Sequence, residues 1–186
     1  MKNIIVVGAG QAGQALVTKL RALGFDGQLT LIGEEPVPPY QRPPLSKNYL
    51  LGDMDLERLF LRPASFYDEH DISLRLGDPV RAIDPAAKTL CVGGDTLSYD
   101  ELALTTGSLP RRLPAAIGGD LVGVYTVRTL ADVDAMAPEF APGRRVLIIG
   151  GGYIGLEAAA VAARKGLSVT VVEMADRILQ RVASPQ

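Results

Sequence analysis

Two glycine-rich sequences contain the residue types and spacing best suited to chemistry in this chain. The first runs from Gly8 to Gly13 and reads G-x-G-x-x-G, after the apolar, β-branched run Asn3 to Val7. A strand, this glycine pattern and a helix in that order form the fingerprint of dinucleotide binding. Free N–H groups and the positive end of the helix dipole can then bind a pyrophosphate.

Each glycine of the first sequence has a separate predicted role. Gly8 permits the tight turn, Gly10 lets the backbone approach a pyrophosphate, and Gly13 lets helix and strand pack closely. Glu34 ends the next apolar run, Gln28 to Gly33, and lies 26 residues after Gly8. A carboxylate at that place can accept both hydroxyl hydrogens of a ribose. A glycine-rich turn without a ligand is the alternative, which the strand, helix and acid together disfavour.

The same pattern recurs from Gly150 to Gly155, after the apolar run Val146 to Ile149 and before an alanine-rich helix. Glu173 ends the next predicted strand and lies 23 residues after Gly150. The two motifs start 142 residues apart, too far for a short solenoid repeat. The sequence thus predicts a second dinucleotide site, formed by Gly150, Gly152, Tyr153, Ile154, Gly155 and Glu173.

Two dinucleotide sites in one chain favour FAD and NAD(H) as the two cofactors. We expect FAD at the first site, because the proline-rich loop from Glu35 to Leu45 can cover a large ligand. We expect NAD(H) at the second site, because Glu173 would repel a 2′-phosphate. Arg177 lies four residues further on and could in principle bind a phosphate, which leaves NADP(H) as the alternative.

The flavin must pass its electrons to an acceptor outside this chain. The sequence has one cysteine, Cys91, so it holds no redox-active pair and no intramolecular disulfide. We interpret Cys91 as a small buried apolar residue in a strand. A one-electron carrier, oxygen or a quinone would then accept the electrons.

The composition narrows the other classes of function. The 186 residues have a net charge of −2, which predicts no nucleic-acid partner. His70 has no cysteine or acid in a recognisable ligand pattern, so no metal site is predicted. The apolar stretches Met1 to Ala15 and Val146 to Ala163 resemble a signal peptide and a membrane span, but their glycines fit strand–loop–helix units better. A single cysteine also fits a cytoplasmic setting.

The pattern predicts the elements that position these residues. Parallel strands are expected at Asn3–Val7, Gln28–Gly33, Ile72–Leu76 and Leu102–Thr105, with an antiparallel meander at Val80–Ile83, Thr89–Val92 and Thr96–Ser98. Expected helices are Gln11–Leu23, Lys47–Leu51 capped by Ser46, Leu59–His70 after Pro63, Thr129–Phe140 capped by Thr129, and Gly155–Lys165. Prolines predict an extended loop from Glu35 to Leu45. Leu109 to Pro114 is the best linker, which gives domains 1–113 and 114–186.

Three sequences together resemble the FAD-dependent ferredoxin reductases, a group with a glutathione-reductase-like α/β fold of two Rossmann-like units. They are Gly8 to Gly13, Arg42-Pro43-Pro44-Leu45-Ser46-Lys47, and Gly150 to Glu157. The resemblance implies electron transfer from NADH through FAD to a [2Fe–2S] ferredoxin that serves an oxygenase. It implies FAD contacts from Ala12, Glu34, Arg42, Lys47, Val80, Thr106, Gly107 and Arg128.

Lys47 and Glu157 are the predicted catalytic residues, expected to approach the flavin from opposite domains. An ammonium near a flavin stabilises the reduced, anionic ring, and a carboxylate in the first turn of a helix gains from the dipole. A solvated lysine and an ordinary glutamate at a helix start are the alternatives. Thr105 stands where the family usually has alanine.

Family members are about twice as long, so the resemblance implies an N-terminal portion whose second unit is incomplete and which is inactive alone. Two other functions stay open at this point. One is an NAD(P)H oxidase or apoptosis-inducing-factor-like flavoprotein with the same two units. The other is a non-catalytic nucleotide-binding fragment.

Overall fold

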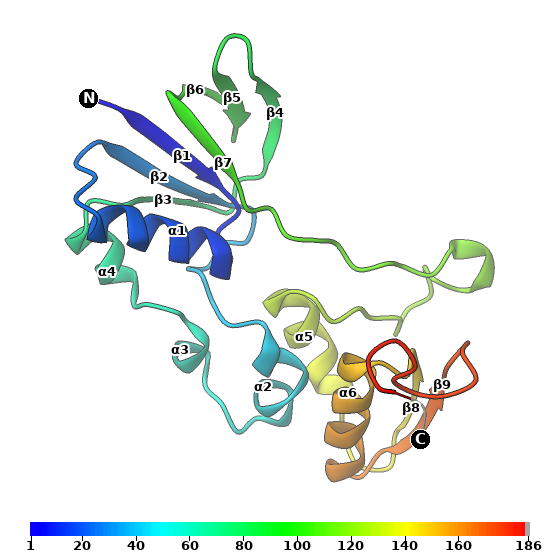
Figure 1. Ribbon diagram of the computed structural model, residues 1–186. Helices are drawn as coiled ribbons and strands as arrows, with labels where there is room; N and C mark the ends of the chain where they lie inside the picture. Colours follow the sequence, from blue (N-terminus) through cyan, green and yellow to red (C-terminus); the bar gives the residue numbers. More distant parts are fainter. Residues whose placement is uncertain (185–186) are drawn as a thin grey trace. The chain divides into compact units, whose positions relative to one another are not determined.

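The computed structural model describes residues 1–184, which form two compact units. Unit 1 contains Met1–Gln41 and Glu57–Ser108, and unit 2 contains Arg42–Leu56 and the chain from Leu109 onward (Figure 1). The chain therefore passes from one unit to the other three times. The segment Arg42–Leu56, which carries the Arg-Pro-Pro-Leu-Ser-Lys sequence, belongs with the second unit.

A four-stranded parallel sheet forms the centre of unit 1. Its order is β3 (Ser73–Leu76), β2 (Gln28–Gly33), β1 (Asn3–Val7), β7 (Glu101–Leu104). β1 lies in the interior, and its residue Val7 pairs with Ile32 on one side and Leu104 on the other. All four predicted strands are confirmed, because β-branched, apolar runs favour strands covered on both faces.

Different elements cover the two faces of this sheet. On one face, α1 (Gln11–Ala22) and α4 (Ala64–Glu69) supply Val17 and Tyr67 to a core that includes Val6, Leu29, Leu31 and Ile72. On the other face lies an antiparallel meander of β4 (Val80–Asp84), β5 (Thr89–Val92) and β6 (Asp95–Ser98). Leu90, Val92 and Tyr99 pack there against Ile5, Val7 and Ile32. The predicted meander on a parallel sheet is confirmed.

The predicted burial of Cys91 is wrong. Its neighbours Leu90 and Val92 are each 1% exposed and point into the core. Side chains alternate along a strand, so Cys91 lies on the outer face of β5 and is exposed. Its sulfur lies 3.8 Å from the hydroxyl oxygen of Thr96.

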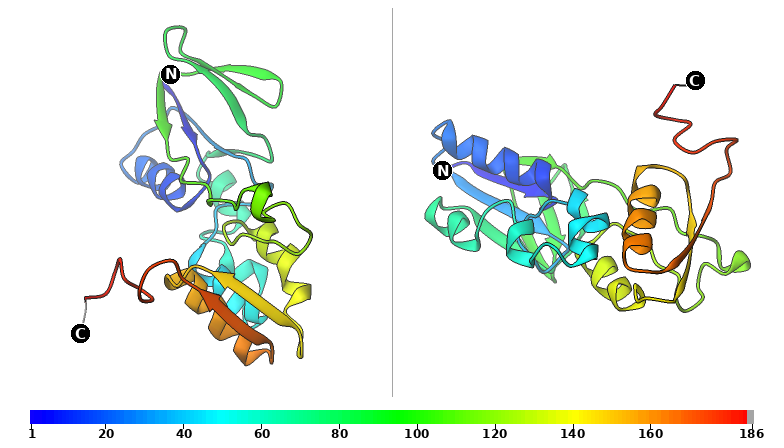
Figure 2. Two further views of the ribbon diagram at one scale, coloured as in Figure 1. Left: turned by 90° about the vertical axis from the view of Figure 1, so that its right-hand side faces the viewer. Right: turned by 90° about the horizontal axis from the view of Figure 1, so that it is seen from below.

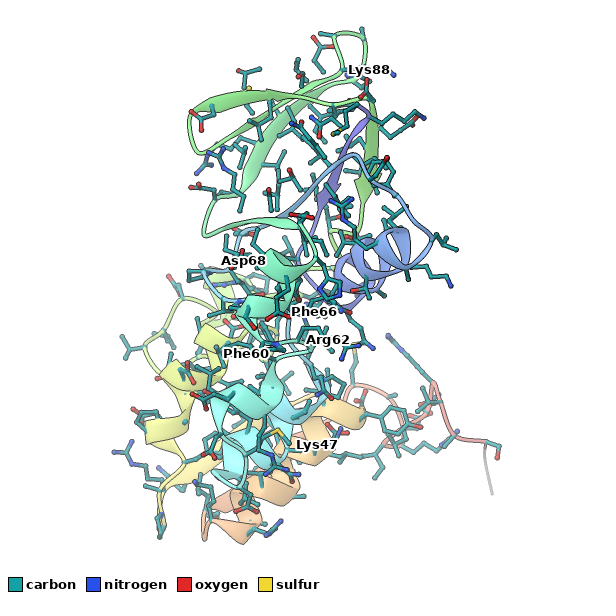
Figure 3. The ribbon with its side chains drawn as sticks, turned by 90° about the vertical axis from the view of Figure 1, so that its left-hand side faces the viewer. Lys47, Phe60, Arg62, Phe66, Asp68 and Lys88 are labelled. Carbon is teal, nitrogen blue, oxygen red and sulfur yellow. The ribbon has the colours of Figure 1, made fainter. Side chains whose placement is uncertain are left out.

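The helix expected after Pro63 is confirmed, because α4 starts at Ala64 and ends at Glu69. The residues before Pro63 form a separate short helix, α3 (Leu56–Leu59). Pro63 adopts an extended conformation, as proline does before a helix start. Phe66 of α4 stacks on the ring of His70, with centroids 4.0 Å apart. The guanidinium carbon of Arg62 lies 5.2 Å from the centroid of the Phe66 ring; Figure 3 labels both residues. His70 is exposed at the end of α4.

Arg21 forms hydrogen bonds near the amino-terminal ends of strands β2 and β3 in the unit 1 sheet. Its guanidinium donates to the carbonyl oxygens of Phe25, Gly27, His70 and Asp71 at 2.5 to 3.0 Å. These carbonyls belong to the turns before β2 and β3. One side chain thus joins the end of α1 to the starts of two strands.

Unit 2 has a smaller sheet of two parallel strands, β8 (Arg145–Ile149) and β9 (Ser168–Val172). α6 (Tyr153–Arg164) connects them and covers one face (Figure 2). The opposite face exposes Leu147, Ile149 and Val172, at 60%, 59% and 49%. This strand–helix–strand arrangement confirms the prediction for the second glycine motif.

α5 (Leu130–Met136) and the short 3₁₀ helix η3 (Ala137–Glu139) replace the single helix expected over Thr129–Phe140. The predicted cap is confirmed: the Thr129 hydroxyl accepts from the N–H of Asp132, and the Asp132 carboxylate accepts from the N–H of Thr129. Pro138 lies in the first turn of η3, where its missing N–H costs no hydrogen bond. Another 3₁₀ helix, η2 (Ala115–Ile117), follows the predicted linker.

The segment Arg42–Leu56 is less extended than the prolines suggested. It contains the 3₁₀ helix η1 (Pro43–Ser46) and α2 (Asn48–Leu51), so the expectation of no helix before Leu45 is wrong. Two prolines at the first positions of η1 fit a helix start, where no N–H is needed. Both pieces pack against α6, and Tyr49 donates a 2.7 Å hydrogen bond to Asp134. Among residues 1–184, no helix is long and apolar enough to cross a membrane.

Candidate functional site

The first glycine loop has the shape that its sequence predicts. Gly8 has a φ of +115°, and its N–H donates to the carbonyl of Ile32 at 2.8 Å. A Cβ at Gly13 would overlap the carbonyl oxygen of Gly8, so only glycine allows α1 to approach β1 this closely. A Cβ at Gly10 would meet nothing within 4 Å, so the loop is open where a pyrophosphate would lie. This cradle fits a dinucleotide.

The segment after β7 closes the back of this loop. Thr105 donates from its hydroxyl to the carbonyl of Gly8 at 2.9 Å. A Cβ at Gly8 would overlap the carbonyl oxygen of Thr105 and lie 2.9 Å from the nitrogen of Thr106. Thr106 and Gly107, the next two residues in the chain after Thr105, therefore lie beside the first glycine loop, and both are exposed. The structure brings together in unit 1 two sequences that lie about a hundred residues apart.

The second glycine loop repeats this geometry in unit 2. Gly150 has a φ of +114°, and its N–H donates to the carbonyl of Val172 at 2.8 Å. A Cβ at Gly155 would overlap the carbonyl oxygen of Gly150, and one at Gly152 would meet nothing within 4 Å. Tyr153 and Ile154 begin α6 and are exposed beside this open position. The second cradle therefore fits a dinucleotide as well.

The two predicted ribose acids differ in their surroundings. Glu34 follows β2 and is exposed. Glu173 follows β9 and is half-buried; its carboxylate accepts from the N–H of Ala175 at 2.8 Å and from that of Gly151 at 2.6 Å. These hydrogen bonds to the charged form hold the pKa of Glu173 below its ordinary value.

A third group of predicted site residues lines one pocket inside unit 2. The pocket has a volume of about 240 Å³, and its walls include Arg42, Ser46, Lys47, Arg128, Ile154 and Glu157. Arg42 donates from its guanidinium to the backbone carbonyl of Arg128 at 2.6 Å. Arg128 lies just before α5, where its N–H donates to Asp132 of the capping box at 3.0 Å. A local capping motif therefore fixes the position of a residue in the pocket wall.

Lys47 and Glu157 form an ion pair in this pocket, with 2.9 Å between Nζ and Oε1. Figure 3 labels Lys47 on the segment that precedes α2. The expectation that these residues come from opposite units is wrong, because Arg42–Leu56 belongs to unit 2 with α6. The ammonium is 45% exposed and the carboxylate 27%, so both are open to a ligand.

Ser46 is the pocket residue that sequence reasoning misplaced. It was expected to cap α2, but the residue at that cap is Lys47, and no side chain there accepts a capping hydrogen bond. The Ser46 hydroxyl instead donates to Oε2 of Glu157 at 2.6 Å. Nothing in the sequence signals this contact, because the two residues lie 111 positions apart.

The remaining predicted residues divide by unit. Ala12 is exposed in the first turn of α1, close to the first loop. Val80 starts β4 and packs against the core under the meander. Both lie in unit 1, so they are not grouped with the pocket of unit 2. Residues 1–184 contain no group of histidine, cysteine and acidic side chains that could hold a metal ion.

Each unit has a glycine loop of the dinucleotide-binding type between a parallel strand and a helix. These two loops define an α/β protein with two dinucleotide-binding units. The chain belongs to the pyridine nucleotide-disulphide oxidoreductase family, whose model matches residues 2–186. Its fold class, predicted from the sequence, is thereby confirmed.

Individual relatives are more specific. The chain is 46% identical to a ferredoxin–NAD(P)(+) reductase from Sphingomonas sp. over 97% of its own length and 44% of the relative's. It is 45% identical to rhodocoxin reductase from Rhodococcus erythropolis, over 98% and 43%. The reductase in a crystal structure of the covalent putidaredoxin reductase–putidaredoxin complex matches with a TM-score of 0.94 and 40% identity, over 99% and 45%.

These matches confirm the resemblance to ferredoxin reductases that the three sequence blocks indicated. The chain spans about half the length of the curated relatives it matches. The fold and the pocket described above therefore belong to this chain of about half length. The activity of a whole protein is proposed from them.

Proposed function

We propose that this chain belongs to a flavoprotein that passes electrons from NADH through FAD to a [2Fe–2S] ferredoxin serving an oxygenase. One observation carries this proposal: each unit has a complete glycine loop with an acid, in a chain with one cysteine. Two nucleotides without a redox-active cysteine pair require an external electron acceptor. Relatives named as ferredoxin and rhodocoxin reductases favour a ferredoxin.

FAD would occupy the first loop, with its pyrophosphate at Gly10 and Ala12 and its ribose at Glu34. Two observations support this placement. There is open space at Gly10, and no side chain caps the backbone N–H groups at the start of α1, so they can bind a phosphate. FAD, when bound, supplies the two-electron acceptor for NADH and the one-electron donor for ferredoxin. Val80, Thr106 and Gly107 are the further unit 1 residues that we assign to it.

NAD(H) would occupy the second loop, with its pyrophosphate at Gly150, Gly152 and Gly155 and its ribose at Glu173. Tyr153 and Ile154 stand exposed at the start of α6, where they can cover part of the ligand. Glu173 keeps its charge to low pH, because two backbone N–H groups bind the ionised form.

The pocket of unit 2 would supply charge at the flavin ring. Arg42, Lys47 and Arg128 are cationic and Glu157 is the one carboxylate among its walls. This net positive charge would stabilise an anionic ligand, and Lys47 is the group we assign to the developing charge on the flavin. Glu157 holds the ammonium in place through the 2.9 Å ion pair. A reducing, cytoplasmic setting, supported by the single cysteine, completes the proposal.

A comparison of electron acceptors tests this function. The holoenzyme that contains this chain is mixed with NADH and either a [2Fe–2S] ferredoxin or air-saturated buffer. We expect fast ferredoxin reduction and slow oxygen consumption. Rapid oxygen consumption without ferredoxin would identify an NAD(P)H oxidase instead. Protein that purifies without flavin absorbance, and takes up none when FAD is added, would identify a non-catalytic fragment.

A further inference from the structure

The carboxylate of Glu157 has a separate partner for each of its oxygens. Oε1 is paired with the ammonium of Lys47 at 2.9 Å, and Oε2 accepts from the hydroxyl of Ser46 at 2.6 Å. Both partners come from consecutive residues at the end of η1, and all three residues lie in unit 2. A carboxylate bound at both oxygens cannot rotate without breaking one of these bonds.

The two partners differ in how firmly they are held. Lys47 is exposed and has a flexible side chain, which also approaches the carbonyl of Pro43 at 3.4 Å. Ser46 is 3% exposed and lies beside Leu45, itself 2% exposed, under α6. A short, buried side chain has few alternative rotamers, so it fixes the carboxylate at a lower cost in entropy than a lysine does.

We propose that Ser46 is a positioning residue, which orients Glu157 so that Glu157 in turn holds the Lys47 ammonium in one place in the pocket of unit 2. This inference rests on the proposed function of the pocket. Without the Ser46 hydroxyl, the Glu157 carboxylate would keep its charge but lose the hydrogen bond that fixes its orientation. The ammonium would then occupy several positions, and a small displacement of a catalytic charge is enough to slow a reaction.

A purely structural role for Ser46 makes a different prediction, because Ser46 would then only attach Arg42–Leu56 to the rest of unit 2. Tyr49 provides a matched control for that role. It lies three residues further on in the same segment, and its hydroxyl donates to Asp134 at 2.7 Å. Tyr49→Phe removes one hydrogen bond between the segment and α5 and leaves Glu157 untouched.

The experiment compares Ser46→Ala, Ser46→Thr, Tyr49→Phe and Glu157→Gln in the FAD-loaded holoenzyme by stopped-flow reduction with NADH. We expect Ser46→Ala to lower the limiting rate about tenfold at an unchanged NADH dissociation constant and flavin content. Ser46→Thr keeps the hydroxyl and should recover most of the rate. Tyr49→Phe should reduce at the wild-type rate.

A second measurement uses the flavin-free protein and needs no activity. The denaturation midpoints of wild type, Ser46→Ala, a Glu157 variant without an acceptor oxygen, and the double variant form a cycle. For this cycle Glu157→Leu replaces Glu157→Gln, because glutamine would keep an oxygen that accepts from Ser46. We expect the Ser46→Ala/Glu157→Leu double variant to unfold at nearly the midpoint of Glu157→Leu alone, since the hydroxyl has lost its acceptor in both. Additive losses would show that the two side chains do not act on each other, and would overturn the inference.

The stopped-flow outcomes separate this inference from the function on which it rests. A wild-type rate in Glu157→Gln would overturn the proposed role of the pocket. A slow Glu157→Gln with a wild-type Ser46→Ala, or equal losses in Ser46→Ala and Tyr49→Phe, would overturn the role of Ser46 alone.

Discussion

The carboxylate of Glu173 accepts a 2.6 Å hydrogen bond from the backbone N–H of Gly151, which joins the end of β9 to the loop before α6. The acid and the glycine loop are thus held as one surface. A ribose bound by the first and a pyrophosphate bound by the second would have a fixed separation, as a dinucleotide requires.

This arrangement predicts that kcat/KM of the holoenzyme is more than tenfold higher with NADH than with NADPH. A tenfold ratio corresponds to a difference of about 1.4 kcal/mol in activation free energy. A 2′-phosphate would lie against a charged Glu173. Arg177, which lies four residues after Glu173 and carries a positive charge, donates to the carbonyl of Ala183 at 2.6 Å. Steady-state kinetics of Glu173→Ala should show a reduced preference, whereas Glu34→Ala in unit 1 should leave the ratio unchanged. Equal rates with both nucleotides in the wild type would contradict the prediction.

The lowered pKa of Glu173 also predicts a pH dependence of stability. A carboxyl with a folded pKa below its ordinary value of 4.5 stabilises the protein above that value, and this contribution is lost as the pH falls through the lowered pKa. The difference in Tm between wild type and Glu173→Gln should be constant from about pH 6 to 8 and shrink below about pH 4.5. A difference that persists unchanged at about pH 2 would rule this out.

Lys47→Ala should slow flavin reduction by NADH while FAD stays largely bound, because the ammonium acts on charge in the ring rather than on the pyrophosphate. Stopped-flow absorbance measures the reduction, and the ratio of flavin to protein absorbance measures retention. Lys165→Ala is the control: this lysine also binds the Arg42–Leu56 segment, through the carbonyl of Leu51 at 3.3 Å, but lies outside the pocket. If Lys47→Ala reduces at the wild-type rate, Lys47 is a surface lysine.

Arg21→Met should destabilise the protein by about 2–4 kcal/mol, since it removes a charged donor to four carbonyls at once. Denaturant unfolding monitored by circular dichroism gives the free energy of unfolding. The matched control is Arg58→Met, at an exposed position, for which we expect a change within about 0.5 kcal/mol. Equal effects of the two substitutions would show that the Arg21 hydrogen bonds contribute no net stability.

Tyr67→Phe should leave the protein as stable as before or raise its free energy of unfolding by about 1 kcal/mol. The hydroxyl of Tyr67 is buried and finds no hydrogen-bond partner among the described residues, and its burial raises the pKa of Tyr67 to about 12. Phenylalanine keeps the ring and its edge-on contact with Phe66. Tyr40→Phe should instead destabilise, because the Tyr40 hydroxyl donates to Glu35 at 2.6 Å. A clear loss of stability in Tyr67→Phe would indicate a partner for its hydroxyl.

Local pattern was sufficient for the elements around both glycine loops. β2 has the predicted bounds, Gln28–Gly33, and the Thr129 cap is present, because an apolar run and a capping sequence act within a few residues. The glycine loops follow from the same kind of short-range constraint. Here the sequence alone predicted both the fold class and the two nucleotide cradles.

The errors occurred where contacts distant in the sequence decide the structure. Ser46 was expected to cap a helix, but a carboxylate 111 positions away binds its hydroxyl. Lys47 was expected in the first domain, but packing of α2 and η1 on α6 places it in unit 2. Periodicity within a window of residues does not record such partners.

The division of unit 2 into two separate stretches of chain affects how the protein is made. Residues 42–56 leave the ribosome about a hundred residues before α6, their packing partner, has been synthesised. Loop-closure entropy rises slowly with length, so this delay affects the rate of folding more than the final stability. Unit 2 can therefore complete its core only after α6 has been synthesised. Neither unit can be released intact by a single proteolytic cut.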